Sequence, residues 1–236
     1  MRGETEAGGA ATASKTAGTE HAGLEHAGTL AALLERVAAG KHLPPDGGVT
    51  ILPQPSPRDC GVISFTAHSV IFTDADPAWV RAELPLGDLG GPMNSRFLQA
   101  LGAKTGRRPR GVDMLCLTES QPGRPRLPLT RRTATDHPRV ALALRTRDNV
   151  MTWEADGGIV LLGRGLAGRW EVAIEVEPDH RGRGLGRELA AAARHLIPAG
   201  VPLWAQISPG NVASVRAFFA AGYQHVGAEA LLPAWD

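Results

Sequence analysis

Residues 170–187 read WEVAIEVEPDHRGRGLGR, and this stretch decides the fold. Its first seven residues are mostly β-branched, aromatic or apolar, which predicts a strand. Pro178 follows the strand, and the glycine-rich hexapeptide RGRGLG occupies residues 181–186. Residues 184–197 then carry apolar side chains at helical spacing, which predicts a helix. A glycine-rich turn between a strand and a helix is typical of phosphate binding, because unpaired backbone N–H groups and the helix dipole act together there.

Two well-known phosphate loops do not fit this turn. The dinucleotide fingerprint requires Gly-x-Gly-x-x-Gly, and after Gly182 and Gly184 its last position holds Arg187. The P-loop requires Gly-Lys followed by Ser or Thr, which the turn lacks. What does fit is Arg-x-x-Gly-x-Gly over residues 181–186. The alternative interpretation is an ordinary glycine-rich turn.

The flanking sequence continues the alternation of strands and helices. Residues 150–155 and 159–163 surround a Gly-Gly pair and predict a β-hairpin. After the turn, the sequence predicts a strand at 202–207, a helix at 211–221 that opens with Asn and is closed by Gly, and a strand at 223–232. This order predicts an α/β or α+β fold.

With these elements around it, the loop resembles the pyrophosphate-binding loop of the GNAT superfamily of acetyl-CoA-dependent N-acetyltransferases. The resemblance covers residues 149–232. It implies a mixed, mostly antiparallel central sheet flanked by helices on both faces. It also implies that acetyl-CoA is the acyl-donor co-substrate and that an acetyl group moves to a primary amine by direct attack.

The resemblance also implies how acetyl-CoA would be held. The pyrophosphate would rest on backbone N–H groups of residues 181–187. The pantetheine arm would pair with the end of the strand at 170–177, in a gap where this strand separates from the next. Asn211 would face the arm, although a plain helix N-cap suits Asn equally well. The residues assigned to the cofactor are Val176, Arg181, Gly182, Arg183, Gly184, Leu185, Gly186, Arg187, Asn211 and Phe218.

Phe218 departs from the family pattern. Many members have a Tyr seven residues after the Asn, which protonates the leaving thiolate; here that position holds Phe218. A thiol with a pKa near ~8.5 can leave as the thiolate without a strong acid, so the reaction does not require that Tyr. The substitution supports a second hypothesis, a catalytically impaired acyl-CoA-binding regulatory module.

A row of carboxylates supplies candidates for the general base. Side chains alternate between the faces of a strand, so Glu171, Glu175 and Glu177 share one face. Freeing the lone pair of an ammonium with a pKa of ~10.4 at pH 7 costs roughly 4–5 kcal/mol, and a nearby carboxylate can relay the proton. Members of the family often use a Glu on this strand, which makes Glu175 and Glu171 the candidates. The alternative is a solvated face or ion pairs with Arg.

The composition argues against nucleic acid, anionic membranes and metal ions as partners. The 236 residues carry 25 Lys and Arg against 24 Asp and Glu, so the net charge of +1 gives no general attraction to nucleic acid or anionic membrane. Eight basic residues between 104 and 132 lack interleaved aromatic residues, which favours solvated loops over a nucleic-acid site. No His or Cys cluster has metal-ligand spacing, so we expect no metal. The expected partner is a small-molecule or peptide amine. The sequence does not decide whether the chain forms a homodimer.

Four regions are predicted along the chain. Residues 1–29 are rich in Gly, Ala, Thr and Glu and predict a disordered tail, and residues 30–58 a short helix and a Pro-rich linker. Residues 59–147 are assigned to the N-terminal, substrate-side part of the fold, and residues 148–236 to the acetyl-CoA-binding core. Two cysteines and no apolar leader favour the cytoplasm.

Overall fold

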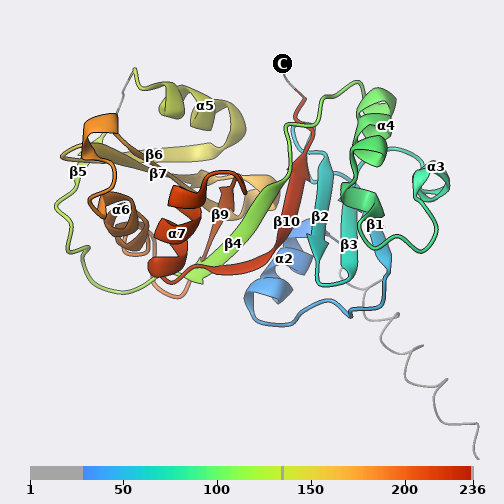
Figure 1. The fold of residues 1–236 in the computed structure, drawn as a ribbon, viewed down its shortest axis with the longest axis horizontal. Helices are drawn as coiled ribbons and strands as arrows, with labels where there is room; N and C mark the ends of the chain where they lie inside the picture. Colours follow the sequence, from blue (N-terminus) through green and yellow to red (C-terminus); the bar gives the residue numbers. More distant parts are fainter. Residues whose placement is uncertain (1–28, 134–135, 235–236) are drawn as a thin grey trace, which may run out of the picture.

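Ten strands of the computed structural model form one sheet (Figure 1). The structure describes residues 29–133 and 136–234. The strands are β1 (Val49–Leu52), β2 (Gly61–Phe65), β3 (His68–Phe72), β4 (Asp113–Glu119), β5 (Thr130–Arg132), β6 (Asp148–Ala155), β7 (Gly158–Arg164), β8 (Trp170–Val176), β9 (Pro202–Ile207) and β10 (Gln224–Leu231). The α-helices are α2 (Leu30–Ala38), α3 (Pro77–Glu83), α4 (Ser95–Thr105), α5 (Pro138–Thr146), α6 (Leu185–Ala193) and α7 (Val212–Ala220). Short 3₁₀ helices cover Gly91–Met93, Leu166–Gly168 and Pro178–His180.

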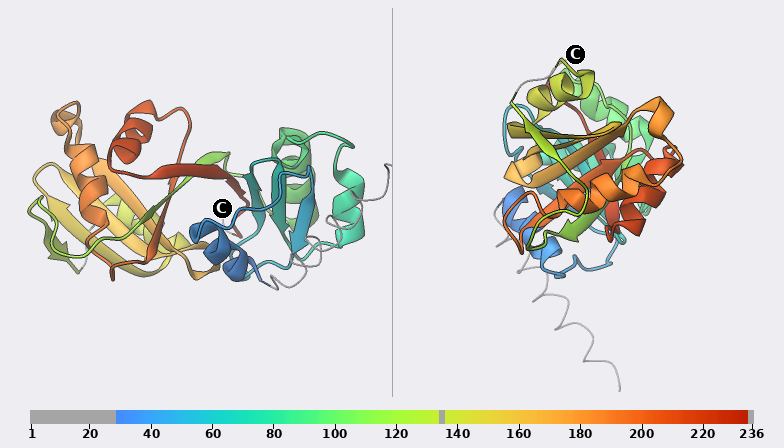
Figure 2. Two further views of the ribbon diagram at one scale, coloured as in Figure 1. Left: turned by 90° about the horizontal axis from the view of Figure 1, so that it is seen from below. Right: turned by 90° about the vertical axis from the view of Figure 1, so that its left-hand side faces the viewer.

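The two halves of the chain exchange strands within this sheet. Its order is β1-β3-β2-β10-β4-β9-β8-β7-β6-β5. The C-terminal strand β10 therefore lies between β2 and β4, and β4 lies between β10 and β9. Figure 1 shows β10 running between the green β4 and the cyan β2, and Figure 2 shows it joining the two ends of an elongated molecule. Each half thus completes the sheet of the other.

Helices cover both faces of the sheet. On one face, α6 and α7 pack against apolar side chains of β7, β8 and β9, while α3 and α4 pack against β2, β3 and β10. On the other face, α2 covers β2, β3, β4 and β9, and α5 covers β7. Among the described strands, only the pairs β1–β3 and β8–β9 are parallel. The predicted fold class, a mixed and mostly antiparallel sheet with helices on both faces, is confirmed.

Local sequence signals fix the ends and buried faces of several elements. In α4 the side chain of Asn94 accepts a hydrogen bond from the N–H of Phe97, and Gly106 closes the helix in the left-handed region at φ 69°. In α2, the four apolar residues spaced at i, i+3, i+4 and i+7 are all buried. The predicted strands at 170–176 and 202–207 match β8 and β9.

Three features differ from the sequence predictions. The helix predicted at 184–197 ends at Ala193, and the chain continues in tighter i→i−3 turns through Leu196. The Pro-rich linker contains β1, which pairs in parallel with β3. Residues 119–138 are rich in Pro and Arg, a composition that predicts a loop, yet they contain the exposed edge strand β5. The tail predicted at 1–29 falls, except for Thr29, outside the described residues. Within the described ranges, no helix is long and apolar enough to span a membrane.

Candidate functional site

The loop between β8 and α6 presents a row of open backbone N–H groups. Among the described residues, no acceptor lies within hydrogen-bond distance of the N–H groups of residues 182–186. Gly182 and Gly184 adopt φ angles of 75° and 89°, in the left-handed region that favours glycine, and a Cβ at either position would meet nothing within 4 Å. Successive N–H groups in such a turn, at a helix N-terminus, attract an anion.

Basic and close-packed side chains surround this loop. Arg181, Arg183 and Arg187 are exposed, so their charges add to the positive end of the helix dipole. Arg181 also donates from Nε to the carbonyl of Val176, 3.1 Å away, which ties the loop to the end of β8. A Cβ at Gly186 would lie 3.5 Å from Ala217 of α7. The loop is therefore open toward solvent and firmly packed beneath.

Beside the loop, β8 and β9 separate. These parallel strands pair only at Trp170↔Leu203 and Glu171↔Trp204. Beyond Glu171, β8 pairs with β7 alone, so one of its edges has no strand partner among the described residues. The predicted gap between these two strands is therefore present. An open strand edge can accept an extended ligand through backbone hydrogen bonds.

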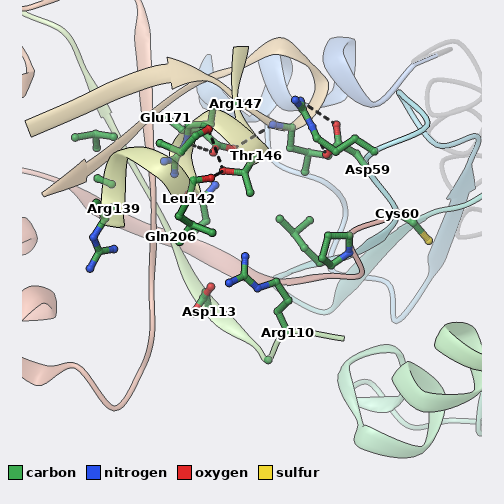
Figure 3. Close-up of a pocket in the computed structure, with 18 residues that line it drawn as sticks. Asp59, Cys60, Arg110, Asp113, Arg139, Leu142, Thr146, Arg147, Glu171 and Gln206 are labelled. Atoms are coloured by element: carbon green, nitrogen blue, oxygen red, sulfur yellow. Dashed lines mark hydrogen bonds and ion pairs between the residues drawn. The ribbon is translucent and has the colours of Figure 1, made fainter. Parts of the chain in front are cut away.

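A cavity of about 300 Å³ opens on the sheet face that α2 and α5 cover. Residues of β8 and β9 line it beside the gap, and α5, the segment before β4 and the segment before β2 complete the wall (Figure 3). The side chains that carry charge or an amide there are Arg58, Asp59, Arg110, Asp113, Arg139, Arg147, Glu171 and Gln206. This volume is at the lower end for small-molecule sites, so the cavity suits a compact polar group.

A buried ion network contains Glu171. Arg147 Nε lies 2.9 Å from Glu171 Oε2, and Arg169 Nε lies 2.9 Å from Glu171 Oε1. The N–H of Leu166 donates to the same Oε1. Arg169 also reaches Glu229 of β10 at 2.7 Å and lies over the ring of Trp204. Burial alone would raise the pKa of Glu171, but the charges of Arg169 and Arg147 lower it to about 2. A carboxylate held this way is a weak proton acceptor.

Glu175 has a different environment on the same face. Arg139 of α5 donates from Nε to its Oε2 at 2.8 Å, and that hydrogen bond lowers the pKa of Glu175. Its side chain is 36% exposed, so water screens the pair. Glu177 is exposed beyond the end of β8. The predicted shared face of Glu171 and Glu175 is confirmed, and both carboxylates form ion pairs with Arg, as the alternative interpretation required.

The C-terminal quarter of the chain matches a known family. Residues 172–231, which run from within β8 to the end of β10, match the family model described as FR47-like protein, which is related to GNAT. Over these residues the resemblance to the GNAT superfamily is confirmed. No curated protein matches the chain significantly.

Two solved structures give GNAT matches at low similarity. One is a GCN5-related N-acetyltransferase from Kribbella flavida, with 18% identity, a TM-score of 0.37, and coverage of 59% of this chain and 64% of that one. The other is a putative acetyltransferase of the GNAT family from Novosphingobium aromaticivorans, with 20% identity, a TM-score of 0.37, and coverage of 54% and 66%. The chain thus spans about two thirds of the length of each.

Two further predicted residues lie on α7 of the GNAT-like segment. Asn211 is exposed, and its side chain accepts a hydrogen bond from the N–H of Ser214 at 3.1 Å, so the predicted N-cap is confirmed. Phe218 is only 4% exposed and packs edge-on against Tyr223, with ring centroids 4.8 Å apart. The Tyr223 hydroxyl donates to the carbonyl of Ala190, and burial raises the pKa of Tyr223 well above its usual value. Contacts of Asn211 and Phe218 with a cofactor stay predictions.

Sequence reasoning missed the groups that other segments bring to the cavity. Asp113 begins β4, and Gln206 lies near the end of β9; pairing between these strands joins residues about ninety positions apart. Arg147 closes α5 and reaches Glu171 from outside the recognised motif. Neither β4 nor β9 alternates apolar and polar residues, so no local pattern signals these positions. Among the described residues, no three His, Cys, Asp or Glu side chains are grouped to hold a metal ion.

Proposed function

We propose that this protein is an N-acetyltransferase that transfers an acetyl group from acetyl-CoA to a primary amine by direct attack. The observation that carries the proposal is the row of unpaired N–H groups at residues 182–186, next to the gap between β8 and β9. The match of residues 172–231 to the FR47-like family supports it. Both observations concern the same 60-residue segment, so the donor side is better supported than the acceptor.

Different residues of the chain would bind the donor and the acceptor of this reaction. The N–H groups of residues 182–186, with Arg181, Arg183 and Arg187, would hold the pyrophosphate. The open edge of β8 up to Val176, and Asn211 beside it, would hold the extended arm. Acetyl-CoA, when bound, supplies the activated acetyl group. The cavity on the opposite face of the sheet would admit the amine and exclude bulk water from the gap.

Calorimetric titration with acetyl-CoA tests the donor side. The wild-type protein should bind acetyl-CoA, and binding should fall when phosphate-rich competitors such as free CoA are present. The acceptor side is then tested by an acetylation screen with polyamines, aminoglycosides, amino acids, and peptides that carry a free N-terminus or a lysine. Failure to bind acetyl-CoA at millimolar concentration would refute the proposal.

A second candidate function is an acyl-CoA-binding regulatory module. The buried Phe218 favours it, because that position lacks the hydroxyl that would protonate a leaving thiolate. Binding of acetyl-CoA without acetylation of any amine in the screen would support this second function. We also propose a cytoplasmic location, which the free thiols of Cys60 and Cys116 support.

A further inference from the structure

Three carboxylates line the cavity, and Asp113 differs from the other two. Asp59 accepts hydrogen bonds from Ser56 at 2.8 Å and from Arg58 at 3.2 Å. Glu171 is held by two guanidinium groups. The carboxylate of Asp113 has no hydrogen bond and no ion pair within 4 Å among the described residues, and in Figure 3 no dashed line reaches it. A partly buried carboxylate with no hydrogen bond or ion pair is costly, which makes Asp113 a candidate for binding a ligand.

The strand register places Asp113 near the gap. Leu115 of β4 pairs with Gln206 of β9, and side chains two residues apart on a strand share a face, so Asp113 and Gln206 lie on the same face as diagonal neighbours. Gln206 follows Trp204, the last residue of β9 that pairs with β8. It therefore lies where the two strands have separated, and Asp113 lies within reach of that opening.

Gln206 adds a second uncommitted group. Its amide nitrogen Nε2 is buried and has no hydrogen-bond partner. An unpaired buried donor beside an unpaired acceptor forms a complementary pair of contacts for a ligand that carries both an N–H and a carbonyl or hydroxyl oxygen. The close-up shows Gln206 between Glu171 and Asp113, on the wall of the same cavity.

The charges around Asp113 come from several segments. They belong to Arg58, Asp59, Arg110, Arg139, Arg147, Glu171 and Glu229. Burial raises the pKa of Asp113, and the charge of Arg110 opposes this. Glu229 is the residue that pairs with Asp113 across the sheet, and it is engaged by Arg169. Asp113 therefore binds a proton more readily than Glu171, whose pKa is about 2.

We propose that Asp113, with Gln206 beside it, binds the acceptor amine and takes its proton, and that Glu171 is a structural group. This inference rests on the proposed acetyltransferase function. An ammonium group enters the cavity and donates one proton to an Asp113 oxygen. The freed lone pair of the nitrogen forms the C–N bond, the C–S bond breaks, and its electron pair leaves on sulfur. Asp113 then releases the first proton to water. The nitrogen loses a second proton to water, and this loss balances the proton that the thiolate takes up.

The test compares Asp113→Asn with Glu119→Gln in the full-length protein. Glu119 is exposed at the other end of β4, so its variant makes the same chemical change on the same strand away from the cavity. Asp113→Asn should lower turnover roughly 10²–10⁴-fold with the amine that the wild type acetylates, and it should remove the limb of the pH–rate profile that rises with pH. Glu119→Gln should change neither.

Two readouts do not depend on turnover. Acetyl-CoA affinity of Asp113→Asn should stay within twofold of wild type, because the loop lies on the other face of the sheet. Its thermal midpoint should change little, because the Asp113 carboxylate makes no hydrogen bond or ion pair that the substitution would remove. Affinity for the amine, measured by calorimetry with free CoA present, should fall at least fivefold.

The possible results separate this inference from the function on which it rests. If the wild type acetylates an amine while Asp113→Asn keeps its turnover and pH profile, the inference is overturned and the proposed function stands. If the wild type binds acetyl-CoA but acetylates nothing in the screen, the proposed function fails and Asp113 has no proton to accept. If Glu119→Gln loses turnover as strongly as Asp113→Asn, the effect belongs to β4 and the inference is overturned.

Discussion

The imidazole of His180 lies so close to Gly157 that a Cβ at residue 157 would stand 2.1 Å from His180 Cγ. Gly157 belongs to the turn between β6 and β7 and has a φ of 75°, while His180 ends the 3₁₀ helix directly before the glycine-rich loop. The N–H of Glu177 also donates to the Gly157 carbonyl. The hairpin turn therefore supports the start of the loop through direct contact.

This contact predicts that Gly157→Ala weakens acetyl-CoA binding. The new methyl group must displace the His180 ring, and the loop moves with it, so the dissociation constant should rise about 2- to 10-fold. His180→Ala removes the clash, so adding Gly157→Ala to that variant should cause a much smaller further loss. Calorimetry on the four proteins of the double-mutant cycle measures the coupling. Equal losses in both backgrounds would mean that the contact does not support the loop.

Gly184→Val should abolish the anion site without unfolding the protein. A β-branched residue strains the left-handed conformation of Gly184, so the loop would change conformation and lose its N–H cradle. Losing even one charge-assisted hydrogen bond, worth about 1.5–3 kcal/mol, should weaken acetyl-CoA binding at least tenfold. Gly123→Val is the matched control, since Gly123 has a φ of 88° and equally open surroundings in a different loop. If both variants bind acetyl-CoA alike, residues 182–186 are not the site.

Glu171→Gln should reduce the free energy of unfolding by roughly 3–5 kcal/mol near neutral pH, because Arg147 and Arg169 would lose the charge that both contact. The same change at Glu154, whose ion pair with Arg132 is at the surface, should cost at most about 1 kcal/mol. Urea unfolding of the wild type and both variants measures these differences. Equal effects at the two positions would show that the buried network does not stabilise the fold.

The pH dependence of this stability follows from the lowered pKa of Glu171. Its value in the folded protein is about 2, below the ordinary 4.5, so the carboxylate stabilises the folded state fully above pH 4.5. That contribution is lost as the pH falls from 4.5 toward 2. The difference in unfolding free energy between wild type and Glu171→Gln should therefore shrink in this range. A difference that stays constant from pH 6 to pH 3 would contradict the assignment.

The strand exchange predicts that the C-terminal half cannot fold alone. A fragment of residues 124–236 contains β5 to β10 but lacks β4, which pairs with both β9 and β10. It should be insoluble or lack a cooperative thermal transition, and co-expression with residues 1–123 should restore a soluble complex. Size-exclusion chromatography and circular dichroism measure both outcomes. A monomeric 124–236 fragment with a sharp thermal transition would rule out this dependence on β4.

The sequence revealed the elements that local patterns determine. The pattern in residues 170–176 acts within one strand and the apolar spacing of α2 within one helix, and β8 and α2 form where predicted. The sequence did not predict β1, because it is only four residues long, lies among prolines, and pairs with β3 alone. The role of Asp113 was not predicted for a related reason. It depends on the register between β4 and β9, which no local pattern encodes.

The position of β10 has a consequence for synthesis on the ribosome. Of the described strands, β10 is translated last, yet it fills the centre of the sheet between β2 and β4. Until it emerges, both of those strands present unpaired backbone edges, and such edges invite association with other chains. At ordinary elongation rates the interval between β4 and β10 lasts roughly 6–20 s. During that time the edges of β2 and β4 that β10 later covers stay open to other chains.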